Sequence, residues 1–388
     1  MISPRPYRLL LNRRHGTPGV VVLPDGGFRR AAEAIRAWSG YVPTPVYDLA
    51  DVAAAARVGA VWWKDESGRF GLGSFKALGG AWAVQHLLVA ELARRSVANN
   101  ASVHDLEAGN FRSATSAITV TCATDGNHGR AVAWAAQRFF CRCVIFVHEG
   151  VSQGRRDAIA AYGAEIRVVP GTYDNAVRAA ARTAEAEGWF VVSDTSYAGY
   201  TEVPRDVMQG YRLMPDEAAD IVPQPPTHAF IQGGVGAVAA AVSVQMRARY
   251  GGEVKIVVCE PDRAPCLLES AESGEPVVLQ GPLDTLMAGL ACGEPSLLAW
   301  QELERGAFAF MAAPDESAVD CMRALARRTY PIVAGESAVA GMACLLLAAR
   351  DPLSRAMLGL DADSRVLLFG TEGATDPALY ESLISTES

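Results

Sequence analysis

Lys76 is a candidate reactive residue because of its type and its surroundings. Only three of the 35 basic residues of this chain are lysines, at positions 64, 76 and 255, and Lys76 lies in the glycine-rich stretch KDESGRFGLGSFKALGG. Arginine cannot replace lysine where an amine must lose its proton and attack a carbonyl group. A lysine at this place in an arginine-rich chain therefore indicates a reactive amine; the alternative is a solvated surface lysine.

The residues around Lys76 predict the environment of its amine. Ser74 is a predicted helix N-cap, and the apolar residues from Phe75 to Leu88 are spaced as on one face of an amphipathic helix. Lys76 would then lie in the first helical turn, where unpaired amides and the helix dipole disfavour the ammonium form.

Three glycine turns could contribute to a binding site. TDGNHG places Asp125, Asn127 and His128 between a predicted strand and a predicted helix, at the ligand-binding edge of an open parallel sheet; an ordinary Asx turn is the alternative. QGGVGA has the same setting, so its amides could hold a phosphate at a helix N-terminus. A dinucleotide loop is also possible there, although the strict G-x-G-x-x-G spacing is absent. In GTEGATD, the hydroxyl of Thr371 could bond a ring nitrogen or cap a turn.

The apolar pattern predicts an α/β protein with two domains. Between residues 118 and 193, runs typical of strands alternate with helical runs, and the alternation resumes after residue 200. Strands separated by helices of this length form parallel sheets. We expect open twisted parallel sheets with flanking helices, in a small domain over residues 96–200 and a large domain over 1–95 and 201–388. Residues 96–116 are polar and are expected to be a surface excursion.

Composition excludes several classes of function. The net charge is −8, and no basic run is interleaved with aromatic residues, so nucleic acid is not expected as a partner. No apolar stretch is long enough for a membrane span or a signal peptide, which favours the cytoplasm. The eight cysteines show no zinc spacing, so no metal is expected. Cys266 and Cys292 both lie in predicted loops and could come close in space.

These features together match pyridoxal phosphate, which needs an amine for its aldehyde, a phosphate site and partners for its ring hydroxyl and ring nitrogen. The sequence resembles the diaminopropionate ammonia-lyases, a family of pyridoxal-phosphate enzymes with the tryptophan synthase β fold, called fold type II. The resemblance extends from Phe28 to Pro377 and rests on SFKALGG, ATDGNHGRAVAWAA, QGGVGA, CEPDRAPC, TLMAGLACGEPS and GTEGATDP. It implies a homodimer that converts the amino acid 2,3-diaminopropionate, D or L, to pyruvate and two molecules of ammonia.

The resemblance also implies how the cofactor is bound. Lys76 would form its Schiff base, Asn127 would contact its ring hydroxyl, and Thr371 would face its pyridine nitrogen. The phosphate cradle would consist of Gly233, Gly234, Val235, Gly236 and Ala237.

Asp125 and Asp194 are the implied acid–base residues. Related serine and threonine dehydratases usually carry a serine where this chain has Asp125. A carboxylate across the cofactor from Lys76 could take the Cα proton of one enantiomer while Lys76 takes that of the other. Asp194 would bind the β-amino group of the substrate, or else cap a loop. A serine or threonine dehydratase and a non-catalytic cofactor-binding homologue are the remaining alternatives.

Overall fold

The computed structural model describes residues 2–124 and 126–385, which divide by their contacts into two compact units. The large unit comprises Met1–Leu23, Pro43–Ser74 and Arg212–Ser388, and the small unit comprises Pro24–Val42 and Phe75–Tyr211. The small unit is wider than the predicted range 96–200, because two helices from before residue 96 and one from after residue 200 pack with it.

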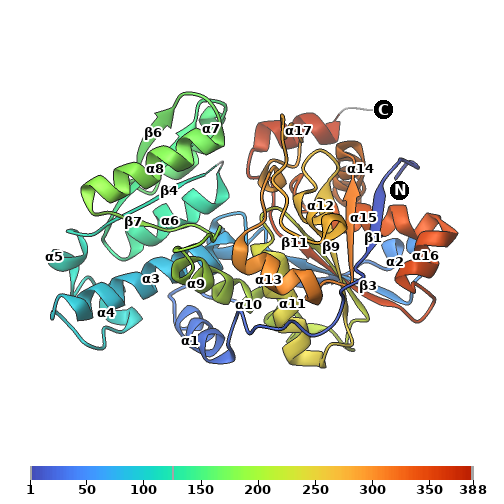
Figure 1. Ribbon diagram of the computed structural model, residues 1–388, viewed down its shortest axis with the longest axis horizontal. Helices are drawn as coiled ribbons and strands as arrows, with labels where there is room; N and C mark the ends of the chain where they lie inside the picture. The colour runs from blue at the N-terminus through green and yellow to red at the C-terminus, as the bar shows by residue number, and fades with distance from the viewer. Residues whose placement is uncertain (1, 125, 386–388) are drawn as a thin grey trace. The chain divides into compact units, whose positions relative to one another are not determined.

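The large unit is built on a seven-stranded sheet with the strand order β1-β10-β9-β8-β11-β3-β2 (Figure 1). Its strands are β1 (Arg8–Leu11), β2 (Val46–Asp48), β3 (Ala60–Asp65), β8 (His228–Gln232), β9 (Lys255–Pro261), β10 (Ala309–Ala313) and β11 (Arg365–Gly370). The five central strands are parallel, as predicted, whereas the edge strands β1 and β2 are antiparallel to their neighbours. Pro43 and Pro45 lie just before the edge strand β2. A proline is tolerated at the start of an edge strand, where no ladder bond is lost.

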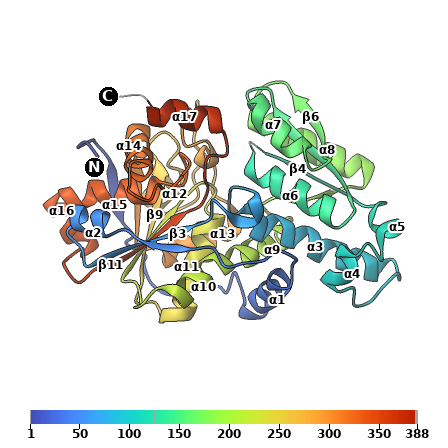
Figure 2. The ribbon, with the colours of Figure 1, turned by 180° about the vertical axis from the view of Figure 1, so that it is seen from behind.

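Helices cover both faces of this sheet (Figure 2). They are α2 (Ala50–Ala56), η1 (Arg69–Gly71), α10 (Leu213–Ile221), α11 (Ala237–Tyr250), α12 (Cys266–Ser273), η2 (Ala288–Leu290), α13 (Leu297–Gly306), α14 (Asp315–Ala326), α15 (Ala340–Arg350), α16 (Pro352–Leu358) and α17 (Pro377–Ser385). Helix α15 packs on β8, β9, β10 and β11 and contacts α2, α14 and α16. Helix α11 packs on β8 and contacts α10 and α13.

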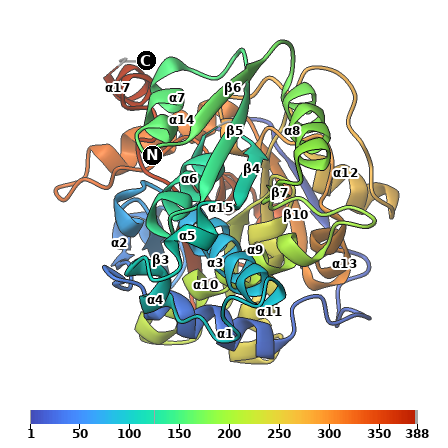
Figure 3. The same ribbon diagram turned by 90° about the vertical axis from the view of Figure 1, so that its left-hand side faces the viewer.

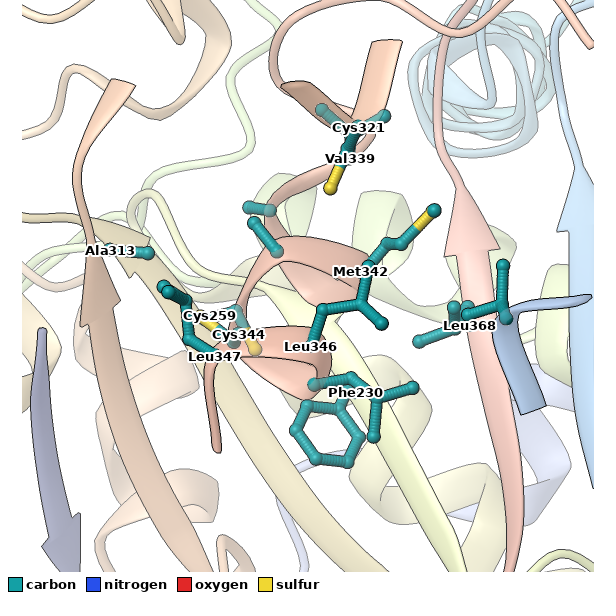
Figure 4. Packing of buried hydrophobic residues seen from close by; sticks show 14 of the residues in the cluster. Phe230, Cys259, Ala313, Cys321, Val339, Met342, Cys344, Leu346, Leu347 and Leu368 are labelled. Atoms are coloured by element: carbon teal, nitrogen blue, oxygen red, sulfur yellow. The ribbon is translucent and has the colours of Figure 1, made fainter. Parts of the chain in front are cut away.

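The main core of the large unit lies between α15 and the sheet (Figure 4). Every residue of α15 except its last is buried, so this helix is apolar all round and not amphipathic. Cys344 and Met342 from α15 lie in one cluster with Phe230 of β8 and Cys259 of β9. Burial of a Met or Phe side chain stabilises the fold by about 1.5–3 kcal/mol relative to the same side chain exposed to water.

The small unit contains a four-stranded parallel sheet with the order β6-β5-β4-β7 (Figure 3). Its strands are β4 (Thr119–Ala123), β5 (Arg142–His148), β6 (Glu165–Val169) and β7 (Phe190–Val191). The crossover helices are α6 (Asn127–Arg138), α7 (Gln153–Ala160) and α8 (Tyr173–Glu187). Val144 and Phe146 of β5 pack against Ala176 and Ala180 of α8, while the alternate residues of β5 face α6. All seven elements lie where the apolar pattern predicted them.

Five more helices complete the small unit: α1 (Asp25–Arg36), α3 (Lys76–Arg94), α4 (Val103–Glu107), α5 (Arg112–Thr115) and α9 (Glu202–Tyr211). Helix α3 packs against both α6 and α9. Residues 77 to 85 are all buried, so the predicted amphipathic face is wrong for the first half of α3. Helices α4 and α5 lie within the stretch that was expected to be irregular. None of the described helices is long and apolar enough to cross a membrane.

Candidate active site

Lys76 is the first residue of α3, as its glycine-rich surroundings predicted. The predicted cap is wrong: Phe75 occupies the N-cap position without a side-chain hydrogen bond, and Ser74 pairs in an isolated β-bridge with Glu372. The amine of Lys76 lies 2.6 Å from the carboxylate oxygen Oδ2 of Asp194, and the two side chains are only 22% and 15% exposed. An ion pair at this distance favours the ammonium form, against the neutral amine expected from the helix dipole.

Two aromatic rings flank the amine of Lys76. Its Nζ lies 5.1 Å from the ring centroid of Phe75 and 5.6 Å from that of Tyr211, and the two rings contact each other. The Tyr211 hydroxyl lies 3.4 Å from Asp194 Oδ2 and donates a long hydrogen bond to it. Among the described residues, Lys76 thus meets a carboxylate and two aromatic rings.

Asp194 is carried by a loop that Tyr200 holds in place. The Tyr200 hydroxyl donates to the carbonyl oxygen of Val191 and accepts from the N–H of Ser193. Burial on its own raises the pKa of Asp194, but the ammonium of Lys76 outweighs burial and holds that pKa well below its usual range. Asp194 is therefore a carboxylate over the whole physiological pH range.

The TDGNHG turn joins β4 to α6. Asp125 lies outside the described residues, and Asn127 is the first residue of α6. The Thr124 hydroxyl accepts from the N–H groups of Gly126 and Gly129, so the turn has the Asx-like bonding that sequence allowed. His128 donates from Nε2 to the carbonyl oxygen of Val192 at 2.7 Å, and burial lowers its pKa. His128 therefore ties α6 to the end of β7 as a neutral residue.

The loop Gly233–Ala237, called the cradle loop below, joins β8 to α11. Its last glycine, Gly236, has a φ of +94° and is the N-cap of α11. Within the described part of the chain, the backbone N–H groups of Gly234, Val235, Gly236 and Ala237 have no acceptor. Four N–H groups without an acceptor at a helix N-terminus are a suitable place for an anion to bind.

Two cysteine side chains lie next to Gly234 of the cradle loop. A Cβ atom at Gly234 would lie 3.1 Å from the sulfur of Cys292, and the Cys266 thiol donates to the carbonyl oxygen of Gly234 at 3.5 Å. Cys266 and Cys292 therefore approach the same glycine, and both are thiols, but Cys266 is the first residue of α12 and does not lie in a loop as predicted. Thr371 follows β11 directly and is buried.

Comparison with known proteins agrees with these features. The model of the family described as "Pyridoxal-phosphate dependent enzyme" matches residues 37–367. Diaminopropionate ammonia-lyase of Escherichia coli K12 is 38% identical over 360 residues, which cover 89% of this chain and 88% of the relative. The Salmonella typhimurium enzyme is 35% identical, with 96% and 95% covered. The crystal structure of the holo Escherichia coli enzyme aligns with a TM-score of 0.90 at 34% identity, covering 99% of this chain and 97% of that one.

The chain belongs to the diaminopropionate ammonia-lyase family. Members of the wider family are pyridoxal-phosphate dependent enzymes of fold type II, which agrees with the predicted fold class. The described residues fit that cofactor: the cradle loop offers four donors for its phosphate, and Lys76 offers a primary amine. Among the described residues, no group of three His, Cys, Asp or Glu side chains could hold a metal ion.

Two residues of the site, Tyr211 and Tyr200, were not found from the sequence. The aromatic ring of Tyr211 reaches Lys76 from the last residue of α9, inside the unremarkable stretch MQGYRL. Tyr200 could have been suspected, since it lies six residues after Asp194 in DTSYAGY. Of the predicted residues, Lys76, Asn127 and Asp194 lie in the small unit, and the cradle loop and Thr371 lie in the large unit.

Proposed function

We propose that this protein is a diaminopropionate ammonia-lyase that converts D- and L-2,3-diaminopropionate to pyruvate and two molecules of ammonia by α,β-elimination. The observation that carries the proposal is the contact of 2.6 Å between the Lys76 amine and the Asp194 carboxylate. It combines an amine that can anchor an aldehyde with an anion that can receive the second amino group of the substrate. A serine has a neutral hydroxyl at that position and would not need the anion.

Each group of residues holds one part of the cofactor in this proposal. Lys76 anchors the aldehyde, the cradle loop binds the phosphate, and Asn127 contacts the ring hydroxyl. Pyridoxal phosphate, when bound, supplies an electron sink that stabilises the negative charge left at the substrate Cα. The neutral hydroxyl of Thr371 at the pyridine nitrogen would leave that nitrogen unprotonated, which makes a milder sink suited to elimination.

The chain's own side chains move the protons. Lys76 takes the Cα proton of one enantiomer, and Asp125 takes that of the other. Asp194 receives the β-amino group when Lys76 is engaged with the cofactor. As a carboxylate it holds that group in the ammonium form, and an ammonium leaves carbon as neutral ammonia without a further proton donor.

We also infer a cytoplasmic homodimer. All eight cysteines are thiols, five of them completely buried, which is typical of proteins from a reducing compartment. Light scattering on the purified holoenzyme tests the dimer, since a monomer would have the chain mass of 41.2 kDa and a dimer would have twice that mass.

Pyruvate release, coupled to lactate dehydrogenase, tests the activity. The substrates to compare are D- and L-2,3-diaminopropionate, D- and L-serine, and L-threonine. We expect both enantiomers of diaminopropionate to exceed serine and threonine in kcat/KM by at least about 10²-fold, because an ionic contact is lost with the hydroxyl substrates. Preference for serine would identify a dehydratase, and a coloured protein without turnover would identify a cofactor-binding homologue.

A further inference from the structure

Glu260 is a completely buried carboxyl group near the C-terminal end of β9. Its Oε1 accepts from the backbone N–H of Leu267 and its Oε2 accepts from that of Leu268, both at 2.8 Å. Since these N–H groups belong to the first turn of α12, Glu260 caps this helix from a neighbouring strand. Glu260 therefore links the first turn of α12 to β9 by two hydrogen bonds.

The first turn of α12 packs directly against the cradle loop. A Cβ atom at Gly233 would lie 2.9 Å from a methyl carbon of Leu267 and 3.0 Å from Cγ of Glu260. Leu267 also approaches Gly236, where a Cβ atom would lie 3.2 Å from its other methyl carbon. With the bond from the Cys266 thiol to the carbonyl of Gly234, α12 meets three glycines of the loop. A shift of α12 would move the loop with it.

The charge of Glu260 matters for an anion in this loop. Among the described residues, no lysine, arginine or histidine forms an ion pair with it. Burial raises its pKa to about 8, against the lowering effect of its two backbone bonds and Cys266. The titratable groups that face it are Cys259 on its own strand and Cys266 and Glu269 on α12. At neutral pH the carboxyl group is mostly protonated and does not repel a phosphate dianion.

We propose that Glu260 is a positioning residue for phosphate binding, which holds the first turn of α12 against Gly233, Gly234 and Gly236 so that the free N–H groups of the cradle loop converge on one anion. The inference rests on the proposed function, because it assumes that the cradle loop binds the cofactor's phosphate. Glu260 does not touch the reacting atoms and acts through the loop alone.

The test compares two ligands that differ only in the phosphate group, pyridoxal phosphate and pyridoxal. Their dissociation constants are measured by absorbance titration of the apoprotein of the wild type and of Glu260→Gln. The glutamine keeps the shape but faces one backbone N–H with an NH₂ group, so one of the two bonds is lost. We expect pyridoxal phosphate to bind about tenfold more weakly to the variant, and pyridoxal to bind equally to both proteins.

Asp351→Asn is the matched control. Asp351 also accepts from two backbone N–H groups at a helix N-terminus in the large unit, but it caps α16 and does not reach the cradle loop. Its variant should bind both ligands as the wild type does. Loss of the preference for phosphate in Asp351→Asn would show that any weakened cap has this effect, and would overturn the specific role of Glu260.

The remaining outcomes separate the two proposals. If the wild type binds both ligands equally, the cradle loop does not bind phosphate and that part of the proposed function fails. If the wild type prefers pyridoxal phosphate and Glu260→Gln keeps the full preference, or loses both ligands equally, Glu260 is not a positioning residue for phosphate.

A measurement on the wild type keeps the inference testable if Glu260→Gln does not fold. Phosphate esters complete their second ionisation near pH 6, so above pH 7 the ratio of the two affinities reports on protein groups near the phosphate. Between pH 7 and 9.5 Glu260 becomes a carboxylate, which accepts more strongly from both N–H groups but also brings a negative charge close to the cradle loop, so the ratio should change in this range. A ratio that stays constant from pH 7 to 9.5 would overturn the inference.

Discussion

The amine of Lys76 and the carboxylate of Asp194 form an ion pair at 2.6 Å across 118 residues of chain. The pair brings together the proposed cofactor anchor and the proposed binding group for the β-amino group. When Lys76 bonds to an aldehyde, Asp194 loses its counterion and can accept a new cation. The same carboxylate therefore serves the protein before and after the cofactor binds.

Replacing Lys76 tests the anchor. Lys76→Ala should abolish the visible absorption of the bound cofactor and lower kcat by roughly 10⁴-fold or more, because no other amine can take this role. Spectra and pyruvate release measure the two effects. Lys255→Ala is the control, since Lys255, the first residue of β9, donates to the backbone carbonyl of Leu358 at the end of α16 and contacts Phe308. An unchanged spectrum of Lys76→Ala would contradict the assignment.

Asp194→Asn should destabilise the apoprotein in a pH-dependent way. The folded-state pKa of Asp194 lies below its unfolded value of about 3.9. Its contribution to stability is therefore fully present above about pH 4 and is lost as the pH falls towards the folded-state pKa. Urea unfolding at pH 7 should show a loss of about 1.5–3 kcal/mol, which shrinks below pH 4.

The control for this prediction is the same substitution, Asp194→Asn, made in the Lys76→Ala variant. Without the ammonium of Lys76, Asp194→Asn should no longer destabilise the protein more at pH 7 than at pH 3. A loss that stays constant with pH in the wild-type background would mean that the ion pair contributes nothing.

Asp125→Asn should affect the two enantiomers unequally. If Asp125 removes the Cα proton on one face of the cofactor, its loss should lower kcat for one enantiomer by about 10²-fold more than for the other. The pyruvate assay with D- and L-2,3-diaminopropionate measures the ratio. Equal losses for both enantiomers would show that Asp125 is not the base.

Two substitutions of Tyr211 separate its hydroxyl from its ring. The bond of 3.4 Å to Asp194 is longer than a normal O–H···O bond, so Tyr211→Phe should lower kcat by less than about tenfold. Tyr211 is fully buried against Phe75, so Tyr211→Ala should lower the free energy of unfolding by about 3–5 kcal/mol. A large loss of activity in a stable Tyr211→Phe would instead assign proton transfer to the hydroxyl.

The large unit contains a buried network of charged side chains, formed by Lys64, Glu66, Arg69 and Glu217. Lys64 donates to Glu217 at 2.5 Å, and Arg69 bonds both Glu217 and Glu66, so two cations balance two anions. Lys64→Met leaves one anion uncompensated and should destabilise the protein by about 3–5 kcal/mol in urea unfolding. Adding Glu217→Gln should recover at least half of that loss. A double variant no more stable than Lys64→Met would show that the loss is steric.

The sequence determined much of the secondary structure, because strands and helices follow from the local spacing of apolar residues. Strands and helices alternate between residues 118 and 193 as predicted, and the alternation resumes after residue 200 with β8, α11 and β9. Local chemistry also placed Lys76 in a first helical turn. The prediction for Ser74 failed, because a residue that is able to cap a helix need not do so. Ser74 pairs instead with Glu372 in a β-bridge.

The tertiary structure decided which distant side chains meet. Lys76 and Asp194, Tyr211 and Phe75, and Glu260 with the cradle loop come together only through the packing of α3, α9 and α12, and no local pattern encodes such contacts. The antiparallel edges β1 and β2 and the burial of the first half of α3 have the same cause, since they depend on neighbours far away in the chain. A sequence specifies the residue types that could do the chemistry, and packing sets their distances and charges.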